Sequence, residues 1–375
     1  MKSQENLDYI SINNLKLDNF RNYQSRNFDF DAKIIAIYGK NGAGKTNILE
    51  AISLLSKGSG IKGAEFCDMV FEQRLQQNFT IYSDIGNHPK IENIGTSFLS
   101  TDNKRIFQID NQLLTSNTRQ RIFPTIIWLT PQMDNLFCSS KTLRRKFLDK
   151  IVADIDPLHN SRINSYNHSV RERISLLQRF GNRENWLNII ERKIAELTTA
   201  IAIARNEAIS YLNQTILEGS DNFTKSEIRI IGEAEQIVLT QTALEAEEQF
   251  AKRIRSNREL DLKSNRTNFG IHRSDLTAIL LGKDIEAKFC STGEQKSILI
   301  ALTFARIRMF SLLNLPMAIL LLDEIASHLD EQKRADLMNE ISTLNCQSFL
   351  TATSRGFFSD LFHFDTKTVS FLELG

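Results

Sequence analysis

Proline and cysteine are both scarce in this sequence, which has 5 prolines and 4 cysteines among its 375 residues. The cysteines lie far apart in the chain and form no CxxC or Cys/His pattern, so neither a zinc site nor a disulfide framework is indicated. A chain of this length can bury large cores without such cross-links. We therefore expect two well-packed domains whose thiols are reduced, as is usual in the cytoplasm.

A large net charge and a long apolar run are also absent. Lys and Arg number 46 and Asp and Glu 45, so the net charge of +1 creates no overall field that would hold the chain on nucleic acid or anionic lipid. Residues 1–9 are polar, unlike a signal peptide, and the longest apolar run, residues 318–322, is far too short to span a bilayer. We expect a soluble, cytoplasmic protein with no membrane partner, in which any polyanion binds a local patch.

Three short apolar runs predict strands. Residues 34–38 are followed by a glycine-rich turn and then a helical pattern, and the runs 318–322 and 347–351 flank a helical stretch over residues 331–344. Runs that are apolar on both faces are typical of buried parallel strands. The sequence therefore predicts an α/β fold whose sheet is assembled from both ends of the chain.

The middle of the chain has a helical texture instead. Apolar residues recur at helical intervals between residues 141 and 212, which predicts three amphipathic helices with breaks near 156–157 and 181–182. Residues 141–205 contain 13 Lys and Arg against 7 Asp and Glu. This is the basic part of the chain, although an excess of this kind can also be a plain solvated helical surface.

One stretch matches the phosphate-loop pattern GxxxxGK[ST] in full, directly after a predicted strand and before a predicted helix. Backbone N–H groups of such a loop surround an anion, and the N-terminal end of the following helix adds positive potential. Lys45 would neutralise charge on the β- and γ-phosphates, and Thr46 would ligate Mg²⁺. The predicted cofactors are thus ATP and Mg²⁺, and the predicted nucleotide-binding residues are Gly39, Lys40, Asn41, Gly42, Ala43, Gly44, Lys45 and Thr46.

An acidic pair follows the apolar run at 318–322 and resembles the Walker B motif of hydrolysing ATPases. Asp323 would hold Mg²⁺, and Glu324 would be the general base for a water that attacks the γ-phosphate. Taken alone, an acidic pair after a strand is more often a helix cap or a turn. The phosphate loop upstream favours the catalytic interpretation, with Lys45 and Glu324 as the catalytic residues.

A third stretch resembles the ABC-type signature, whose usual form is Ser-Gly-Gly-Gln. Here it consists of Ser291, Thr292, Gly293, Glu294 and Gln295 and precedes a helical pattern. The N-terminus of that helix would face an anion, and this end cannot reach the phosphates held by its own loop, so it would close on the nucleotide of a second subunit. Without this context, Ser291 and Glu294 are simply a capping box.

Several single residues fit the same plan. Gln132 would bridge Mg²⁺ to the helical lobe, and Asp330 belongs to a stretch, Ala326–Asp330, that resembles the D-loop of a dimer interface. Arg21 would either reach the phosphates or form a plain surface pair. The stretch Leu350–Ser354 has no histidine where transporter ATPases carry a switch histidine, so His272 and His328 are interpreted as structural.

Beyond these motifs, the chain resembles the RecF family of bacterial recombinational repair over almost its whole length. The stretches that carry the likeness are Leu17–Tyr23 (LDNFRNY), Gly39–Ile52 (GKNGAGKTNILEAI), Arg144–Asp149 (RRKFLD), Gly270–Leu276 (GIHRSDL), Ser291–Lys296 (STGEQK) and Leu320–Glu324 (LLLDE). The most specific are Phe20–Tyr23 and the pair His272 and Arg273. The chain departs from the family at Ile271, where Pro is usual, and at Glu324, where many members have Asp.

The resemblance implies a P-loop ABC-type ATPase core, like an SMC head, with an inserted, mainly helical second lobe. The expected domains are residues 1–132 (ATPase, N-terminal part), 133–267 (helical lobe) and 268–375 (ATPase, C-terminal part). It also implies ATP-driven homodimerisation, clamping on duplex DNA near gaps, slow hydrolysis stimulated by DNA, and a role in recombinational repair and replication-fork restart with RecR and RecO as partners. For Arg273 it marks the position without assigning a chemical role.

Four other classes of protein share some of these motifs. A nucleotide-binding subunit of an ABC transporter is disfavoured by the missing histidine and by the 158 residues between Gln132 and Ser291. A long coiled-coil SMC protein would need sustained heptads, which are absent. Another short SMC-like ATPase, or a module that uses ATP as a structural clamp without turnover, remains an alternative at this stage.

Overall fold

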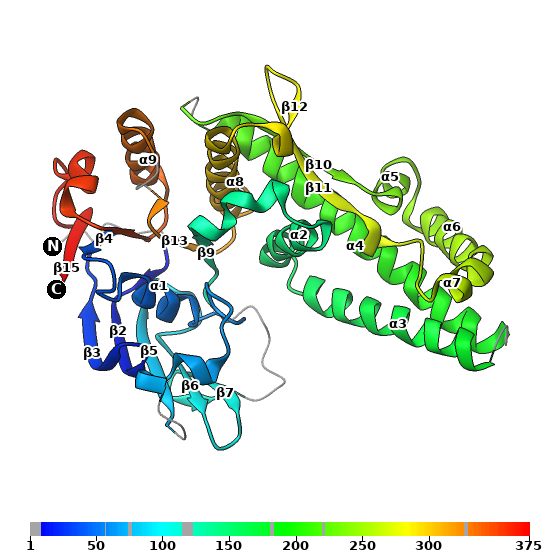
Figure 1. Cartoon of the computed structure of the whole chain (residues 1–375), viewed down its shortest axis with the longest axis horizontal. Helices are drawn as coiled ribbons and strands as arrows, with labels where there is room; N and C mark the ends of the chain where they lie inside the picture. Colours follow the sequence, from blue (N-terminus) through cyan, green and yellow to red (C-terminus); the bar gives the residue numbers. More distant parts are fainter. Residues whose placement is uncertain are drawn as a thin grey trace. The chain divides into compact units, whose positions relative to one another are not determined.

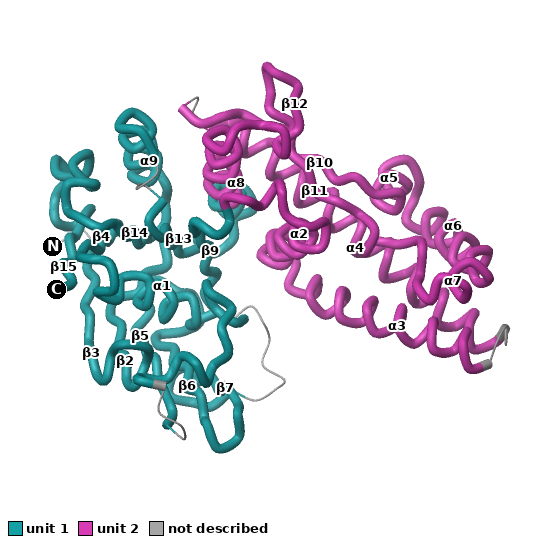
Figure 2. Tube along the Cα trace, viewed as in Figure 1, with its two compact units in different colours: residues 1–133, 307–375 teal, residues 134–306 magenta. Residues whose placement is uncertain are grey.

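The computed structural model describes residues 9–56, 58–73, 77–114, 123–180, 184–219, 222–325 and 329–375. Figure 2 shows the chain divided into two compact units, unit 1 with residues 1–133 and 307–375 and unit 2 with residues 134–306. Residues 268–306, which the sequence analysis assigns to the ATPase domain, thus belong by their contacts to unit 2. In the described part of the chain, no helix combines the length and apolarity needed to cross a membrane.

Unit 1 contains a five-stranded, wholly parallel sheet. Its strands, in spatial order, are β15 (Val369–Leu374), β4 (Ile34–Gly39), β14 (Ser348–Ala352), β13 (Ile319–Leu322) and β9 (Ile126–Leu129). Every residue of β13 and β14 is buried, and β13 consists of apolar residues alone, as is typical of a central parallel strand. The predicted strands at 34–38, 318–322 and 347–351 are confirmed, as is the helix at 331–344, which is α9 (Glu331–Thr343).

A second, antiparallel sheet completes unit 1 and was not predicted. Its strands are β1 (Ser11–Ile12), β2 (Asn14–Phe20), β3 (Tyr23–Asp29), β5 (Phe79–Gly86), β6 (Asn93–Leu99), β7 (Lys104–Ile109) and β8 (Gln112–Leu113). Its order is β3-β2-β5-β6-β7-β8, with β1 paired to β5. Side chains from both sheets and from α1 (Lys45–Ser53) form one apolar core, so the helix after the phosphate loop is anchored on two sheets (Figure 1).

Unit 2 is mainly helical. The three predicted helices are confirmed as α2 (Lys141–Ile155), α3 (His159–Phe180) and α4 (Glu184–Glu218), and α3 and α4 run side by side in Figure 1. A small sheet of β10 (Ser226–Ile231), β11 (Asp275–Leu280) and β12 (Ile285–Glu286) and the short helices α5 (Glu233–Thr240), α6 (Ala243–Ser256) and α7 (Arg258–Ser264) pack around them. Helix α8 (Thr292–Leu312) begins in unit 2 and ends in unit 1.

Six single-turn or 3₁₀ segments connect these elements within the described residues. They are η1 (Phe66–Met69), η2 (Phe71–Gln73), η4 (Pro131–Cys138), η5 (Ile271–Arg273), η6 (Ala287–Phe289) and η8 (Arg355–Leu361). Because the strands of the parallel sheet run in one direction, the residues that follow β4, β13, β14 and β9 emerge at the same edge of that sheet. Ligands of open α/β sheets bind at this edge.

Candidate functional site

The phosphate loop turns from β4 into α1 through a residue that must be glycine. Gly44 caps α1 with a φ of +96°, in the left-handed region. A Cβ on Gly44 would lie 2.5 Å from the hydroxyl of Tyr23 and 2.6 Å from Nδ2 of Asn22. Asn22 in turn accepts a hydrogen bond from Asn47 Nδ2 at 2.8 Å. The turn between β2 and β3, which the family resemblance singled out, therefore supports the start of α1.

The side chain of Lys45 lies inside this loop. Its ammonium donates to the carbonyl oxygens of Gly39 at 2.8 Å and Lys40 at 3.1 Å, and it lies 3.6 Å from Glu324 Oε1. Lys45 is only 4% exposed. The cation is thus held at the carboxyl edge of the sheet, next to the carboxylate predicted to be the general base. Lys40, Asn41 and Gly42 are exposed at the tip of the loop, and Ala43 is half-buried.

The two predicted Mg²⁺ ligands meet although they are 277 residues apart in the sequence. The hydroxyl of Thr46 donates to Asp323 Oδ1 at 2.9 Å and to Oδ2 at 3.1 Å. A hydroxyl and a carboxylate are the hard oxygen donors that Mg²⁺ prefers, and two protein ligands suffice where phosphate oxygens supply others. No group of three or more His, Cys, Asp or Glu suited to a metal occurs in the described residues. The pair Thr46 and Asp323 therefore fits Mg²⁺ bound together with a nucleotide.

A residue that the sequence analysis did not select joins the two acidic residues. Thr351, near the end of β14, donates its hydroxyl proton to Asp323 Oδ1 at 2.8 Å and accepts the backbone N–H of Glu324 at 2.9 Å. Glu324 has a φ of +51°, and its side chain is 33% exposed. No distinct signal was available in the sequence, because Thr351 is one of three polar residues in the run 347–351.

Burial dominates the electrostatics of this group. It raises the pKa of Asp323 above its ordinary value, and the charge of Glu324 adds to the rise. Hydrogen bonds from Thr351 and Thr46 and the charge of Lys62 act in the opposite direction but do not cancel it. The carboxylate is consequently a costly buried charge that a cation would stabilise.

Arg21 forms an internal ion pair. Its guanidinium donates to both oxygens of the buried Glu50, at 2.8 and 2.6 Å, and to the carbonyl oxygen of Asp68 at 2.8 Å. Lys62 lies 3.4 Å from the same carboxylate. In this structure Arg21 therefore ties the turn after β2 to α1. Its predicted contact with phosphates stays a prediction.

Gln132 and Asp330 lie at the ends of elements of unit 1. Gln132 is exposed in η4, just after β9, so it follows a strand of the parallel sheet at the edge where the phosphate loop lies. Asp330 caps α9, and its side chain accepts from the backbone N–H of Lys333 at 2.8 Å. Of the other residues of the predicted D-loop, Ala326, Ser327 and His328 lie outside the described part of the chain, and Leu329 is half-buried.

The predicted signature forms a capping box at the start of α8. Ser291 accepts from the backbone N–H of Glu294 at 3.3 Å, and Glu294 accepts from the backbone N–H of Ser291 at 2.9 Å. Lys283 lies 2.6 Å from Glu294, and these partners lower the pKa of Glu294 to about 2. Gln295 is buried and donates to the carbonyl oxygen of Cys290 at 2.9 Å. Thr292 and Gly293 are exposed at the helix end.

Comparison with known proteins shows which proteins this chain is similar to. A model of the AAA domain matches residues 14–218. The chain is 36% identical to the DNA replication and repair protein RecF of Rickettsia canadensis, over 92% of this chain and 95% of that protein. It is also 36% identical to the protein of the same name from Rhizobium rhizogenes, over 94% of both chains.

Solved structures give the same fold. The recombination mediator protein RecF with ATPrS, of the RecFOR pathway, superposes with a TM-score of 0.81 at 24% identity over 94% of both chains. The Smc head domain of Pyrococcus furiosus superposes with a TM-score of 0.54 at 17% identity over 94% of this chain and 92% of that one. The predicted fold class, an ABC-type ATPase core like an SMC head with a helical second lobe, is confirmed.

Proposed function

The chain belongs to the RecF family of DNA replication and repair proteins, and from this premise we propose that it is an ATPase that binds DNA when it has bound ATP. The observation that carries the proposal is the meeting of Lys45, Thr46, Asp323 and Glu324 at the carboxyl edge of one parallel sheet. A phosphate loop, a cation ligand and a carboxylate base are the parts that phosphoryl transfer to water requires.

In this proposal each residue has a distinct task. The backbone from Gly39 to Thr46 and the start of α1 bind the phosphates, and Lys45 exchanges its carbonyl partners for β- and γ-phosphate oxygens. Thr46 and Asp323, with Gln132 as a further ligand, would hold Mg²⁺, which would supply positive charge next to the phosphates. Glu324 accepts a proton from the attacking water.

A second copy of the chain completes the site. The capped N-terminus of α8, with Ser291 and Gly293, presents backbone N–H groups and positive potential to an anion. We assign this end to the γ-phosphate of ATP held by the other copy, which makes ATP the link between two subunits. Hydrolysis, slow and stimulated by DNA, would then separate them.

The DNA-related part of the proposal follows from the family. The relatives are named for DNA replication and repair, and the structural relative is named as a recombination mediator of the RecFOR pathway. We propose that the ATP-bound homodimer clamps duplex DNA near gaps during recombinational repair and replication-fork restart, with RecR and RecO as partners. The basic stretch over α2, α3 and α4 would contact phosphates with little base readout.

The composite site can be tested by mixing two defective variants. Lys45→Ala disables phosphate binding, and Ser291→Arg blocks the helix end that faces the second copy. In a mixed dimer one site carries both changes and the other carries neither, so a 1:1 mixture should recover about a quarter of wild-type phosphate release, whereas each variant alone has almost none. A mixture as inactive as its components would contradict the composite site.

The same assay separates turnover from a static ATP clamp. Phosphate release by the wild-type chain should rise when duplex DNA is added. Binding of ATP without any release, with or without DNA, would favour the structural-clamp alternative.

A further inference from the structure

Residues 267–274 lie between α7 and β11 and include His272 and Arg273, and we call them the linking segment. The side chain of Arg273 is exposed, and its guanidinium forms no hydrogen bond or ion pair with any residue that the structure describes. The backbone on either side of Arg273 is, by contrast, held by an unusual number of buried polar groups.

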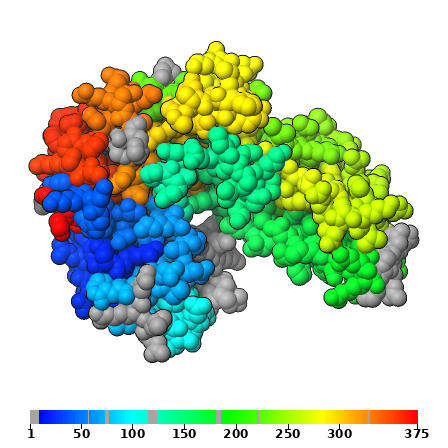
Figure 3. Space-filling model, viewed as in Figure 1, coloured from blue at the N-terminus to red at the C-terminus, as the bar shows by residue number. Residues whose placement is uncertain are grey.

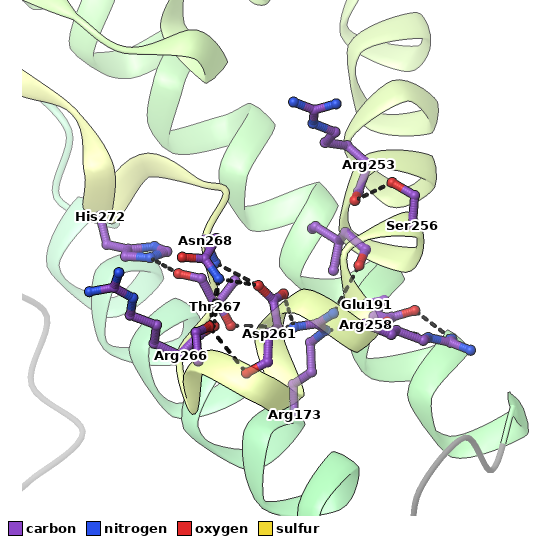
Figure 4. Close-up of polar contacts among 12 residues, drawn as sticks. Arg173, Glu191, Arg253, Ser256, Arg258, Asp261, Arg266, Thr267, Asn268 and His272 are labelled. Carbon is purple, nitrogen blue, oxygen red and sulfur yellow. Dashed lines mark hydrogen bonds and ion pairs between the residues drawn. The ribbon is translucent and has the colours of Figure 1, made fainter.

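The first of these groups is centred on Arg173 of α3 (Figure 4). Its guanidinium donates to Glu191 Oε1 at 3.0 Å, to Asp261 Oδ2 at 2.7 Å and to the hydroxyl of Thr267 at 3.4 Å. Asp261 also accepts from the backbone N–H of Asn268 at 2.9 Å. Arg173, Glu191 and Asp261 are at most 1% exposed. This group fixes the first residues of the linking segment.

The second group is centred on Arg205 of α4. It donates to the carbonyl oxygen of Ile271 at 2.9 Å, to Glu235 Oε1 at 2.8 Å and to both oxygens of Asp149 at 2.9 and 3.0 Å. Glu235 in turn accepts from the hydroxyl of Ser274 at 2.7 and 2.6 Å. This group fixes the backbone immediately before and after Arg273.

The ring of His272 forms hydrogen bonds with Thr267 and Tyr166 and so holds the segment between these two groups. Its Nε2 lies 2.8 Å from the carbonyl oxygen of Thr267, which can only accept, so Nε2 carries the proton and Nδ1 accepts from the hydroxyl of Tyr166 at 2.6 Å. Burial lowers the pKa of His272, in agreement with a neutral ring. Gly270 has a φ of +133°, and a Cβ there would lie 2.1 Å from the Tyr166 hydroxyl. The linking segment can therefore adopt only one backbone path.

Such networks seldom raise stability above what apolar side chains would give, because the burial of charge offsets the attraction between the partners. Their clearest effect is to fix geometry. In the linking segment, the backbone geometry that is fixed is that of Arg273, an exposed arginine whose guanidinium has no partner among the described residues. A rigid, pre-positioned arginine binds a ligand at a smaller entropic cost than a mobile one.

A second guanidinium contacts the backbone beside Arg273. Arg145 of α2 donates to the carbonyl oxygen of Ser274 at 2.7 Å, one residue after Arg273. On the face of unit 2 shown in Figure 3, the surfaces of α2 and of the yellow region that includes β11 adjoin each other. Burial and the charges of Arg205 and Arg273 lower the pKa of Arg145, as expected for cations crowded together.

The carboxylates around this pair are already occupied. Asp275 is bound by Arg144 at 2.7 Å and lies 3.9 Å from Lys141, and Asp149 and Glu235 are bound by Arg205. Neither Arg145 nor Arg273 forms an ion pair with any of them among the described contacts. The surface of unit 2 thus has two arginines, Arg145 and Arg273, whose positive charges are not neutralised by an ion pair among the described contacts. An external anion could bind them.

We propose that Arg273 and Arg145 form a binding site for the phosphate groups of a DNA backbone. The guanidinium fork matches phosphate oxygens in pairs, and two such groups on a rigid surface suit a polyanion with regularly spaced charges. The site lies beside α2, at the beginning of the basic stretch 141–205. This inference rests on the proposed DNA binding and locates part of it.

The test is a titration of a fluorescent 30-base-pair duplex with the full chain and ATP over a series of salt concentrations. Arg273→Ala should weaken binding about 5- to 20-fold at moderate salt and lower the slope of log K against log salt by about 0.9 for one lost phosphate contact. The DNA affinity of Arg273→Lys should lie between those of the wild type and Arg273→Ala, because lysine keeps the positive charge but lacks the two-pronged guanidinium group. The matched control is Arg255→Ala, which removes another exposed arginine of unit 2, on α6.

Three outcomes are distinguishable. Arg273→Ala with reduced DNA affinity, a reduced salt slope and unchanged ATP binding supports the site. Unchanged DNA affinity and slope in Arg273→Ala overturn it while leaving the proposed function intact, and so does a loss confined to binding of RecR, which would make the ligand an acidic protein surface. A wild-type chain that binds no duplex at all instead contradicts the proposed function itself.

Discussion

Asp323, which we propose as a Mg²⁺ ligand, is a residue whose proposed function opposes the stability of the fold. Its carboxylate is buried, its pKa is raised by that burial, and its nearest partners are the two hydroxyl groups of Thr46 and Thr351. A cation ligand must be ionised, whereas burial favours its neutral form. In the nucleotide-free protein this conflict costs free energy of folding at neutral pH.

We therefore expect the variant Asp323→Asn to be more stable than the wild type, by an amount that depends on pH. An acid whose pKa is higher in the folded chain adds stability below its unfolded pKa, about 3.9, and loses it as the pH rises through the folded value. Asp323→Asn should therefore unfold at a higher temperature than wild type at pH 7, by about 2–4 °C for each kcal/mol relieved. The gain should vanish near pH 4, as thermal unfolding across pH would measure.

Asp365→Asn is the control for this prediction. Hydrogen bonds from Thr368 lower the pKa of Asp365, so its replacement should give no gain at pH 7. A lower unfolding temperature for Asp323→Asn at pH 7 would show that its hydrogen bonds outweigh the cost of burial.

The sequence motifs predicted that some of these side chains lie close together, but not others. Lys45, Thr46, Asp323 and Glu324 belong to stretches whose spacing reflects shared chemistry, and the structure brings them together. The contacts of Arg21 could not be predicted from the sequence. Its partner Glu50 lies on the buried side of α1, and no spacing in the sequence links the two residues. The predicted roles of Arg21, Gln132 and Ser291 in nucleotide binding stay predictions.

Among the elements, β14 has a special position, because it lies between β4, which leads into the phosphate loop, and β13, which leads into Asp323. Its residue Thr351 contacts both acidic residues at once. The strand therefore sets the position of Asp323 relative to the backbone of Glu324, whose left-handed φ would otherwise be unfavourable for a non-glycine residue.

Thr351→Val should accordingly slow hydrolysis while leaving binding nearly unchanged. It keeps the shape and removes two hydrogen bonds, each worth about 0.5–1.5 kcal/mol, so kcat should fall about tenfold while the affinity for ATP changes less than about threefold. Steady-state phosphate release and nucleotide titration would measure the two quantities.

Two further variants show whether the hydroxyl itself matters. Thr351→Ser should restore most of kcat, because it retains the donor and acceptor. Thr199→Val should match wild type, because that buried hydroxyl donates only to the carbonyl of Ala195 in its own helix. An equal loss of affinity and kcat in Thr351→Val would point to a folding defect instead of a positioning role.

Some of the helices and strands could be predicted from the sequence and others could not. Three strands of the parallel sheet, β4, β13 and β14, and the helices α2, α3 and α4 were predicted from local signals, either a short strand-like run or apolar periodicity along one face. The strands β9 and β15 of the same sheet were not predicted. The antiparallel sheet was missed even though β5 buries alternate residues, including Phe79, Ile81 and Ile85. Period-2 alternation over short, polar strands is a weaker signal, and pairing between distant strands decides the outcome.

For the whole molecule, the chemical parts are divided between the two units. The phosphate loop and the acidic pair belong to unit 1, whereas the capping box at Ser291 belongs to unit 2. Our account has each copy supply one part to the nucleotide of the other, so that ATP controls the number of copies in the complex and, with it, the binding of DNA. Because the net charge of the chain is only +1, we expect local sites such as the one proposed at Arg273 to hold DNA.

The most direct test is the mass of the Glu324→Gln variant measured by sedimentation equilibrium with saturating ATP and Mg²⁺. Without its general base the variant should retain ATP, so the mass should rise from that of one chain, 42.9 kDa, to about twice that value. Lys45→Ala under the same conditions should remain a single chain. If Glu324→Gln with bound ATP also sediments as a single chain, ATP does not join two copies and the account is wrong.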